Sequence, residues 1–486
     1  MPLSGAQVRH GRLRPAGEHA VSLLQDLGAG ARAESPAHGI ELLLPGVGSG
    51  TVADPAGAPD ALGDWAASGA MSLTGMADGP PLVAPGTPAT AARGAAVAIE
   101  LVSAALASST QGFSRVGLDG AELLGERAAI AGLSRRGDVS PGGSCRLVPA
   151  ADGLLAVNLA RGDDIDLVPA WLETGPVAGD VWQVVVAEAA RRPVAVLEDR
   201  AVLLGMPVAA VPDRVDAAAE PWRLSPTQPR PRPRPTGPGR VVDLSSMWAG
   251  PLCANLLGLA GFEVVKVESV SRPDGARKGP AQFYDLLHRG HRSVAVDFGT
   301  RSGRAELEGL LAGADVVVDS SRPRATEQLG VAPERILAEH PEVVWVSITG
   351  YGRRGPARNR VAFGDDAAAA AGLVARTEDA TPVFCGDAIA DPLAGIHAAL
   401  VALAMRAGGC GGLADVAMRD VVASTLRGCP DLSEPARSAR RGSNGAWRLD
   451  TRSGPVEVAA PAARPPVGSA TPSATGRAEV ADPGCR

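Results

Sequence analysis

The sequence predicts an α/β fold with a doubly wound, mainly parallel sheet. From Val241 to Ile348, short apolar strands alternate with helical segments, which is the pattern of a parallel sheet covered by helices. A proline-rich segment separates this region from a less regular first half. With 486 residues, the chain is long enough for more than one hydrophobic core.

In the second half, strands and helices follow one another closely along the chain. Gly250 and Pro251 precede the first helix, and Gly261 ends it. A long Ala/Leu-rich helix comes last. We expect strands at 241–244, 263–267, 293–296, 315–319 and 343–348, and helices at 252–260, 302–311, 333–339 and 387–406.

The first half carries weaker signals of regular structure. Residues 91–107 have the small apolar side chains of a buried helix, and an Ala-Asp-Gly turn at 151–153 divides a strand-like segment at 147–159. We also expect helices at 22–27 and 181–190 and a strand at 41–44.

The segment 221–239, PWRLSPTQPRPRPRPTGPG, predicts a linker, because alternating proline removes backbone donors and favours extended polyproline II structure. It divides a first half at 1–220 from a second half at 240–458. The tail at 459–486 is rich in Pro, Ala and Ser and is expected to be mostly irregular.

The composition excludes several classes of protein. A net charge of −6 offers no electrostatic basis for binding nucleic acid. The first thirty residues include charges and no continuous apolar core, and no run approaches 18 apolar residues, so we expect neither a signal peptide nor a membrane span. The six cysteines form no C-x-x-C pair, so we expect no metal. A cytoplasmic enzyme is the simplest expectation.

Several segments of the second half, in this order and spacing, resemble the family III (CaiB/BaiF) CoA-transferases, over roughly Arg240 to Ala423. This family includes formyl-CoA transferase and carnitine CoA-transferase, with the α-methylacyl-CoA racemases as relatives. The resemblance implies the family's Rossmann-like topology. The segments are VVDLSSMWAGPLCANLLGLAGFEVVKVES from 241, HRGHRSVAVDF from 288, ADVVVDSSRP from 314, WVSITGYGRRGPARNR from 345 and ADPLAGIHAALVALAMR from 390.

Asp391 matches the family's nucleophile, an aspartate in a segment like A-D-x-x-x-G-x-x-A-A. By local sequence alone, Asp391 before Pro392 at a helix start would suit an N-cap. Both roles are compatible, because a helix N-terminus stabilises a carboxylate. Asp387, four residues earlier, is expected in a solvated loop, and His397 is expected to serve packing.

The resemblance implies transfer of CoA from an acyl-CoA to a carboxylic acid through an aspartyl-CoA intermediate. Asp391 would attack the donor thioester, and backbone N–H groups should stabilise the oxyanions. No tightly bound cofactor is implied, since coenzyme A and acyl-CoA are substrates.

The same match implies where coenzyme A binds. Trp248 and Ala249 begin the helix whose N-terminus lies near CoA in the family. A departure is Ser269, which stands where the family often has an arginine, so the resemblance does not imply adenine stacking by this residue. The remaining candidates are Ser320 and Ser321 in the cleft, Arg360 near the phosphates, and Arg272, Arg277 and Lys278, for which surface solvation is an equal alternative.

Two other functions remain open. An acyl-CoA racemase would need a catalytic His in a G-H-D segment, and Phe363 in the matching stretch cannot move protons. A CoA-binding protein without activity is the other alternative, because part of the first half is eroded.

The first half resembles the same family in pieces, so the chain looks like a fusion of two eroded copies. Thr90 stands where Asp391 stands in the second half, and a hydroxyl cannot form the anhydride. The resemblance also implies a smaller α+β domain, and this small domain is matched only in the first half. We therefore expect a pseudo-dimer within one chain, or a homodimer, in which Gly142 and Gly143 could cover Asp391; an ordinary turn at 141–143 is the alternative.

Overall fold

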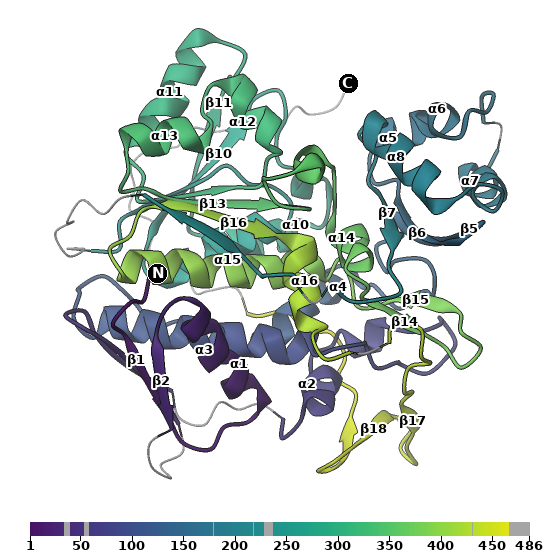
Figure 1. The fold of residues 1–486 in the computed structure, drawn as a ribbon, viewed down its shortest axis with the longest axis horizontal. Coiled ribbons are helices and arrows are strands. Elements are labelled where there is room, and N and C mark those ends of the chain that lie inside the picture. Colours follow the sequence, from purple (N-terminus) through teal and green to yellow (C-terminus); the bar gives the residue numbers. More distant parts are fainter. Residues whose placement is uncertain are drawn as a thin grey trace.

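The structure is a mixed α/β fold built around a mainly parallel sheet (Figure 1). This computed structural model describes residues 1–33, 39–52, 58–177, 179–216, 218–227, 237–429 and 431–465.

The central sheet has seven strands in the order β11-β10-β9-β12-β13-β16-β8. All neighbours are parallel except β16 and β8. The valine-rich β12 and the apolar β13 are buried along their whole length, as expected for parallel strands covered on both faces. The strands are β8 (Arg223–Pro226), β9 (Arg240–Asp243), β10 (Glu263–Ser269), β11 (Arg292–Val296), β12 (Val316–Asp319), β13 (Val344–Thr349) and β16 (Gly412–Ala417).

Part of the segment predicted as a linker belongs to this sheet. Residues 223–226 form β8, which pairs antiparallel with β16 at the edge. An edge strand tolerates Pro226, because proline cannot donate to a neighbouring strand. The Arg/Pro repeat itself, at 228–236, lies outside the described residues.

The helices of the second half confirm the alternating pattern. Thr300 caps α11 by accepting from the Gly303 N–H, and proline opens α12 and α13 in their first turns. The helices are α9 (Ala249–Leu259), α10 (Ala281–His288), α11 (Arg301–Ala312), α12 (Pro323–Leu329), α13 (Pro333–Glu339), α14 (Gly364–Ala370), α15 (Ala390–Ala407) and α16 (Met418–Thr425), with 3-10 turns η3 (Gly275–Lys278) and η4 (Pro356–Asn359).

The first half begins with a separate four-stranded sheet in the order β2-β1-β3-β4. Its first two strands are parallel and joined by a helix, as are β9 and β10 in the second half. The strands are β1 (Gln7–His10), β2 (Gly30–Ala33), β3 (Ile40–Leu44) and β4 (Gly48–Val52); the helices are α1 (Pro15–Asp26), α2 (Ala61–Ala67), α3 (Pro88–Ala107) and α4 (Glu126–Ala131), with η1 (Met71–Leu73) and η2 (Glu122–Leu124).

A smaller unit lies to one side of the molecule (Figure 1). Its antiparallel sheet packs helices around the buried Trp171, whose Nε1 donates to the Leu197 carbonyl. It comprises β5 (Cys145–Ala150), β6 (Gly153–Asn158), β7 (Val208–Val211), α5 (Gly162–Asp166), α6 (Val168–Leu172), α7 (Val181–Ala189) and α8 (Val194–Leu204). Short strands complete the fold: β14 (Val374–Arg376), β15 (Pro382–Phe384), β17 (Arg440–Arg441), β18 (Trp447–Thr451) and β19 (Gly454–Glu457).

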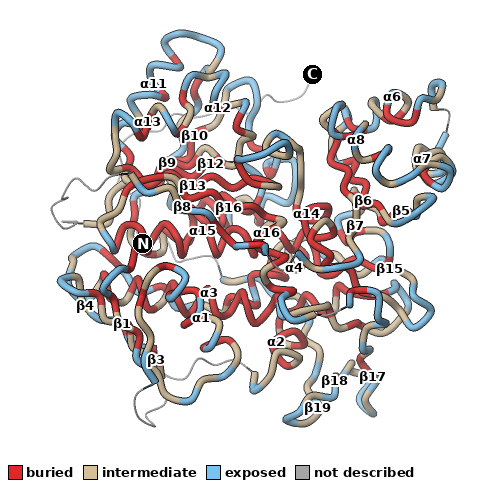
Figure 2. Tube along the Cα trace, viewed as in Figure 1, coloured by how far each residue is buried: buried red, intermediate tan, exposed pale blue. Residues whose placement is uncertain are grey.

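One hydrophobic core crosses both halves of the chain. Helix α1 packs on α3, α9 packs on α15, and α3 and α15 pack on each other, forming a buried centre (Figure 2). Gly395 allows α15 to approach α9 closely, since a Cβ there would lie 2.6 Å from the Ala249 carbonyl oxygen.

Helix α3 bears on the expectation that the chain has no membrane span. Its length and mean hydropathy would suffice to cross a membrane, although charged and polar residues interrupt its apolar residues. Most of its residues are buried inside the fold, where the helix contacts α1, β4 and α15, so it serves as a core helix here.

Candidate active site

Asp391 is the second residue of α15, and its carboxylate faces the start of α9. The N-cap of α15 is Ile389, so the interpretation of Asp391 as the helix cap is wrong. The carboxylate instead accepts a hydrogen bond from the backbone N–H of Ala249, the first residue of α9. A helix N-terminus concentrates unpaired N–H groups and favours negative charge, so α9 stabilises the ionised form of Asp391.

Three further carboxylates surround Asp391. Asp365 and Asp366 lie in the first turn of α14, and Asp387 lies in the loop before α15. Their relative exposures are 6%, 0% and 0%, whereas Asp391 is half-buried. Asp391 is therefore the member of this carboxylate cluster (Asp365, Asp366, Asp387 and Asp391) that a substrate can reach most easily.

The first half contributes a cation to this cluster. Arg127 of α4 forms a two-pronged bond with Asp387, with Nε–Oδ2 at 2.8 Å and Nη2–Oδ1 at 2.5 Å. Asp387 is fully buried, so its expected place in a solvated loop is wrong. The guanidinium carbon of Arg127 also lies 5.8 Å from the Trp248 ring centre, within the range of a cation–π contact.

Burial shifts the acidities of these groups. It raises the pKa of Asp391 to about 7, with Arg127 opposing the rise and Asp365 adding to it. It raises the pKa of Asp366 to about 8, although Asn158 donates to that carboxylate. Burial also raises the pKa of Asp365 and that of Asp387. The cluster therefore holds protons near neutral pH, and Asp391 changes charge there.

The backbone around Asp391 is tightly constrained. A Cβ on Gly364 would overlap both Oδ2 of Asp391 and the carbonyl oxygen of Ala388. Ala388 itself has a φ of 43°, an unfavourable left-handed conformation for a residue with a side chain, and its N–H donates to Asp365. Glycine at 364 is thus required by the close approach of the carboxylate.

The predicted loop of the first half lies beside the cluster. Ser140 hydrogen bonds to Asp365, and a Cβ on Gly142 would lie 3.1 Å from Nη2 of Arg127 and 3.7 Å from Oδ1 of Asp387. Gly143 has a φ of 85° and faces Arg136. The structure thus places Gly142 at the Arg127–Asp387 pair, and a role of either glycine toward an oxyanion stays a prediction.

The corresponding position in the first half has no comparable free carboxylate. Thr90 donates from Oγ1 to Asp64 at 2.6 Å. Arg93 pairs with Asp64 and, through Nη2 at 2.7 Å, with Asp119. These groups bond to one another, which leaves this place with a structural network.

The predicted CoA-binding residues next to α9 lie together at the carboxyl ends of β9 and β12. Trp248 is 2% exposed, and its ring packs edge-on against Phe283 at 5.4 Å. Ser320 accepts from the Ser246 N–H at 3.2 Å, and the Ser321 N–H donates to Asp319 at 2.8 Å. Ligands of open parallel sheets bind at such carboxyl ends.

The predicted basic residues are more dispersed. Arg360 bonds to Glu198 and the Val208 carbonyl of the small unit, at 2.7 and 3.0 Å. Arg277 is exposed and pairs with Glu268 at 2.6 Å, whereas Lys278 is exposed in η3. Their roles toward coenzyme A stay predictions.

Arg272 belongs to a group that sequence reasoning did not identify. Burial lowers the pKa of Arg322, and the neighbouring cations Arg324, Arg161 and Arg272 lower it further. Arg322 follows Ser320 and Ser321 directly. We call Arg161, Arg272, Arg322 and Arg324 the arginine group. Arg161 is already paired with the buried Asp164, and neighbouring cations of this kind are suited to a polyanion.

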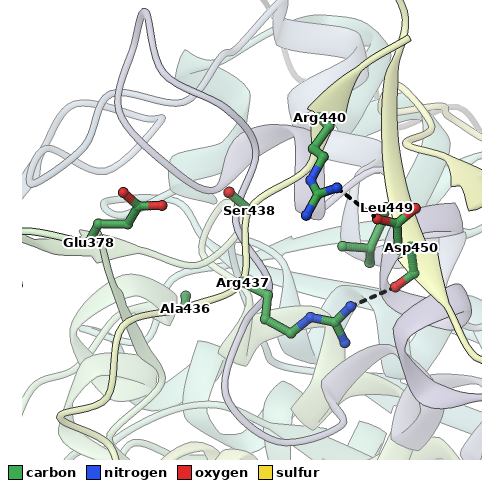
Figure 3. A pocket seen from close by; sticks show the side chains of 7 residues that line it. All are labelled: Glu378, Ala436, Arg437, Ser438, Arg440, Leu449 and Asp450. Atoms are coloured by element: carbon green, nitrogen blue, oxygen red, sulfur yellow. Dashed lines mark hydrogen bonds and ion pairs between the residues drawn. The ribbon is translucent and has the colours of Figure 1, made fainter.

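Two other observations concern metal-binding groups and a hollow away from this site. Within the described ranges, no group of three or more His, Cys, Asp or Glu side chains could hold a metal ion. A hollow of about 230 Å³ lies elsewhere (Figure 3). Within it, Arg437 donates to the backbone carbonyl of Asp450, and Arg440 forms an ion pair with the Asp450 carboxylate. Its lining residues are Glu378, Ala436, Arg437, Ser438, Arg440, Leu449 and Asp450.

The region of the chain that holds Asp391 is similar to known proteins. Residues 239–443 match CoA-transferase family III. Over 173 residues the chain is 34% identical to succinyl-CoA–D-citramalate CoA-transferase of Chloroflexus aurantiacus, covering 34% of this chain and 43% of that protein. Over 168 residues it is 33% identical to human succinyl-CoA:glutarate CoA-transferase, covering 33% and 38%.

Among solved structures, a CAIB/BAIF family protein from Brucella suis is similar at 27% identity with a TM-score of 0.39, covering 46% of this chain and 65% of that chain. The chain spans less than half the length of the two curated relatives named above. Residues 239–443 of this chain are thus similar to CoA-transferase family III.

Proposed function

We propose that this protein transfers CoA from an acyl-CoA to a carboxylic acid, with Asp391 as the nucleophile. The observation that carries the proposal is the setting of Asp391. It is the most exposed carboxylate of its cluster, it meets the first N–H of α9, and it lies near the cation of Arg127. The family of residues 239–443 agrees with this chemistry.

The reaction balances without a metal or an oxidant. The Asp391 carboxylate attacks the thioester carbon and the C–S bond breaks. CoA departs as the thiolate, and a mixed anhydride forms between Asp391 and the donor acyl group. The thiolate then attacks the aspartyl carbon, which releases the donor acid and forms aspartyl-CoA. An acceptor carboxylate attacks that thioester, and the returning thiolate takes the new acyl group and frees Asp391.

The groups around Asp391 control its ionisation and can stabilise the oxyanions formed during transfer. Asp391 must be ionised to attack, and a pKa of about 7 gives a carboxylate that is more basic than usual yet still half ionised at neutral pH. The Ala249 N–H and the N-terminus of α9 face the same oxygens, so they are suited to an oxyanion at the aspartyl carbon.

We place the phosphates of coenzyme A at the arginine group. The segment after β12 joins the two places: Arg322 follows Ser321, and Ser320 accepts from Ser246 in the loop that leads to Ala249. A ligand with phosphates at one end and a thioester at the other could span from the arginine group to Asp391. The strand order also supports a doubly wound sheet, because successive strands are added on one side of β9 up to β11 and on its other side from β12 onward.

We further propose that the chain is a fused pseudo-dimer with one retained nucleophile. Support comes from the matching β–α–β units β1-α1-β2 and β9-α9-β10, and from the matching helix pairs α1–α3 and α9–α15. The first half supplies Arg127, Ser140 and the small unit, whereas the second half supplies Asp391.

The substrates are suggested by the relatives. Their names include succinyl-CoA with D-citramalate or glutarate as partners, so succinyl-CoA is the first donor to test, with five-carbon diacids as acceptors.

The test is transfer by the full chain from succinyl-CoA to a panel of acids, followed by mass spectrometry. Asp391→Asn removes the ionised oxygen at nearly constant shape, and Asp379→Asn is the control at an exposed loop carboxylate. We expect the Asp391 variant to lose transfer and hydroxylamine to label Asp391 during turnover.

Normal transfer by Asp391→Asn would overturn the assignment. Exchange of the α-proton with deuterated water, without movement of CoA between acids, would replace it with the racemase. Binding of CoA with no turnover on the whole panel would replace it with a non-catalytic protein.

A further inference from the structure

The segment after β19 returns across the first half of the chain. The Ala459 N–H donates to the Ala66 carbonyl of α2 at 2.8 Å. Pro461 lies against Gly69 and Gly125, where an added Cβ would come within 2.8 and 3.3 Å of its Cα. These contacts fix residues 459–464 on the surface just before α4.

Arg464, near the end of this segment, forms an ion pair with a carboxylate that is completely buried. Glu126 is 0% exposed, and Arg464 reaches it with Nε at 2.5 Å, its backbone N–H at 3.2 Å and Nη2 at 3.2 Å. A buried carboxylate without its partner is strongly unfavourable, so this pair holds the segment and α4 together.

The same guanidinium also reaches a second helix. Nη1 of Arg464 donates to Oδ1 of Asn255 on α9 at 3.3 Å. The amide of Asn255 is oriented by its own bonds, since Nδ2 donates to the Leu287 carbonyl at 3.1 Å. Arg464 therefore bridges α4 of the first half and α9 of the second half.

These two helices present the groups that face Asp391. Residue 127, which follows Glu126 on α4, is the arginine beside the carboxylate cluster, and Ala249 opens α9 with the N–H that binds Asp391. A change in the distance between α4 and α9 would move the cation and the N–H donor relative to each other.

We propose that residues 459–464 form a strap that sets the position of α4 against α9, with Arg464 as a positioning residue for Asp391. This inference rests on the proposed function, because it assigns the strap to the same site. The alternative is that the segment only stabilises the fold.

The experiment separates these roles with Arg464→Ala, Arg464→Lys and the double variant Glu126→Gln/Arg464→Ala in the full chain. Glutamine at 126 removes the buried charge that Arg464→Ala leaves unpaired. Arg452→Ala is the matched control, since its side chain is exposed in the preceding turn. Melting temperature, kcat, KM for succinyl-CoA and the pH profile of kcat are measured for each.

We expect Arg464→Ala to lower kcat at least tenfold and to move the kcat–pH profile toward higher pH, with KM within about twofold. In the double variant, the melting temperature should recover while the loss of kcat and the shift persist. Arg464→Lys should restore part of kcat. If kcat and the pH profile recover together with the melting temperature, or if Arg464→Ala matches Arg452→Ala, the strap has no positioning role.

A readout without turnover keeps this test apart from that of the proposed function. The carbonyl band of protonated Asp391, identified by infrared difference against Asp391→Asn, gives its titration directly. An upward shift of that titration in Arg464→Ala supports the strap even if no transfer is found. An unchanged titration overturns it, whatever Asp391 does in catalysis.

Discussion

Replacing Gly364 by alanine would test the close packing at Asp391 with a single methyl group. Gly364 is the first residue of α14 and does not have a positive φ, so the backbone accepts alanine there. The new Cβ would overlap Oδ2 of Asp391 and the Ala388 carbonyl, well inside the 3.0 Å below which such contacts essentially do not occur. Either the carboxylate must rotate or α14 must move.

The two consequences differ in size. Overpacking of this kind costs about 1–3 kcal/mol of folding free energy. A displacement of a reacting group by about 1 Å can lower a rate by roughly 10²-fold. We therefore expect Gly364→Ala to fold, with a modest loss of stability and a loss of kcat of about two orders of magnitude, while KM for the acyl-CoA changes little.

The assay is steady-state transfer from succinyl-CoA together with urea unfolding. Gly309→Ala is the control, since Gly309 lies in α11 with nothing within 4 Å of an added Cβ. That variant should gain about 1 kcal/mol, because alanine favours a helix over glycine, and should keep normal kcat. A Gly364→Ala enzyme with kcat within twofold of the wild type would refute the required close approach.

Other perturbations test the electrostatics. Arg127→Met should lower kcat at pH 7 and move the kcat–pH profile toward higher pH, because the cation lowers the pKa of Asp391. Arg127→Lys should keep a higher kcat and a smaller shift of the profile. An unchanged profile in Arg127→Met would contradict this. For the wild type, kcat should rise through an apparent pKa near 7 as Asp391 ionises, and a flat profile from pH 6 to 8 would contradict this. Burial lowers the pKa of His19 to about 3 and that of His397 to about 4. Below pH 6.5 the unfolded chain therefore binds more protons at these histidines than the folded chain does, so the free energy of unfolding should fall as the pH drops. Each group should lower it by about 3 kcal/mol by pH 4. Urea titrations of wild type and His397→Gln from pH 7 to 4.5 check this, and equal slopes would contradict it.

The second half was predicted well because its signals are local. Runs such as Val316–Asp319 and Val344–Thr349 are apolar and bounded by turn residues, so both strands appeared at the expected places. The linker was predicted less well. Residues 223–226 pair with β16, and this pairing depends on a strand nearly two hundred residues later that no local pattern reveals.

The candidate site was found only in part for the same reason. Asp391 stands in a family segment, but its partners come from separate parts of the chain. Arg127 is a charged residue of a short helix, and Asp365 lies two residues past Phe363, where the sequence offered no reason to expect burial. Adjacent acidic residues such as Asp365 and Asp366 could have been a signal, since they follow Gly364 in the first turn of a helix that continues with alanine.

The amino-acid sequence by itself determined the alternation of strands and helices and the similarity of the second half to CoA-transferase family III, and it made Asp391 the candidate nucleophile. Those properties depend on residue types at short spacing, which local propensity and motif express. Only the tertiary structure decided that Asp391 is one of four clustered carboxylates, that Arg127 of the other half is their cation, and that Arg464 bridges the two helices facing it. The physical reason is that the pKa of Asp391 and the position of its partners depend on burial and on nearby charges. Folding brings these groups together from parts of the chain that are far apart in the sequence.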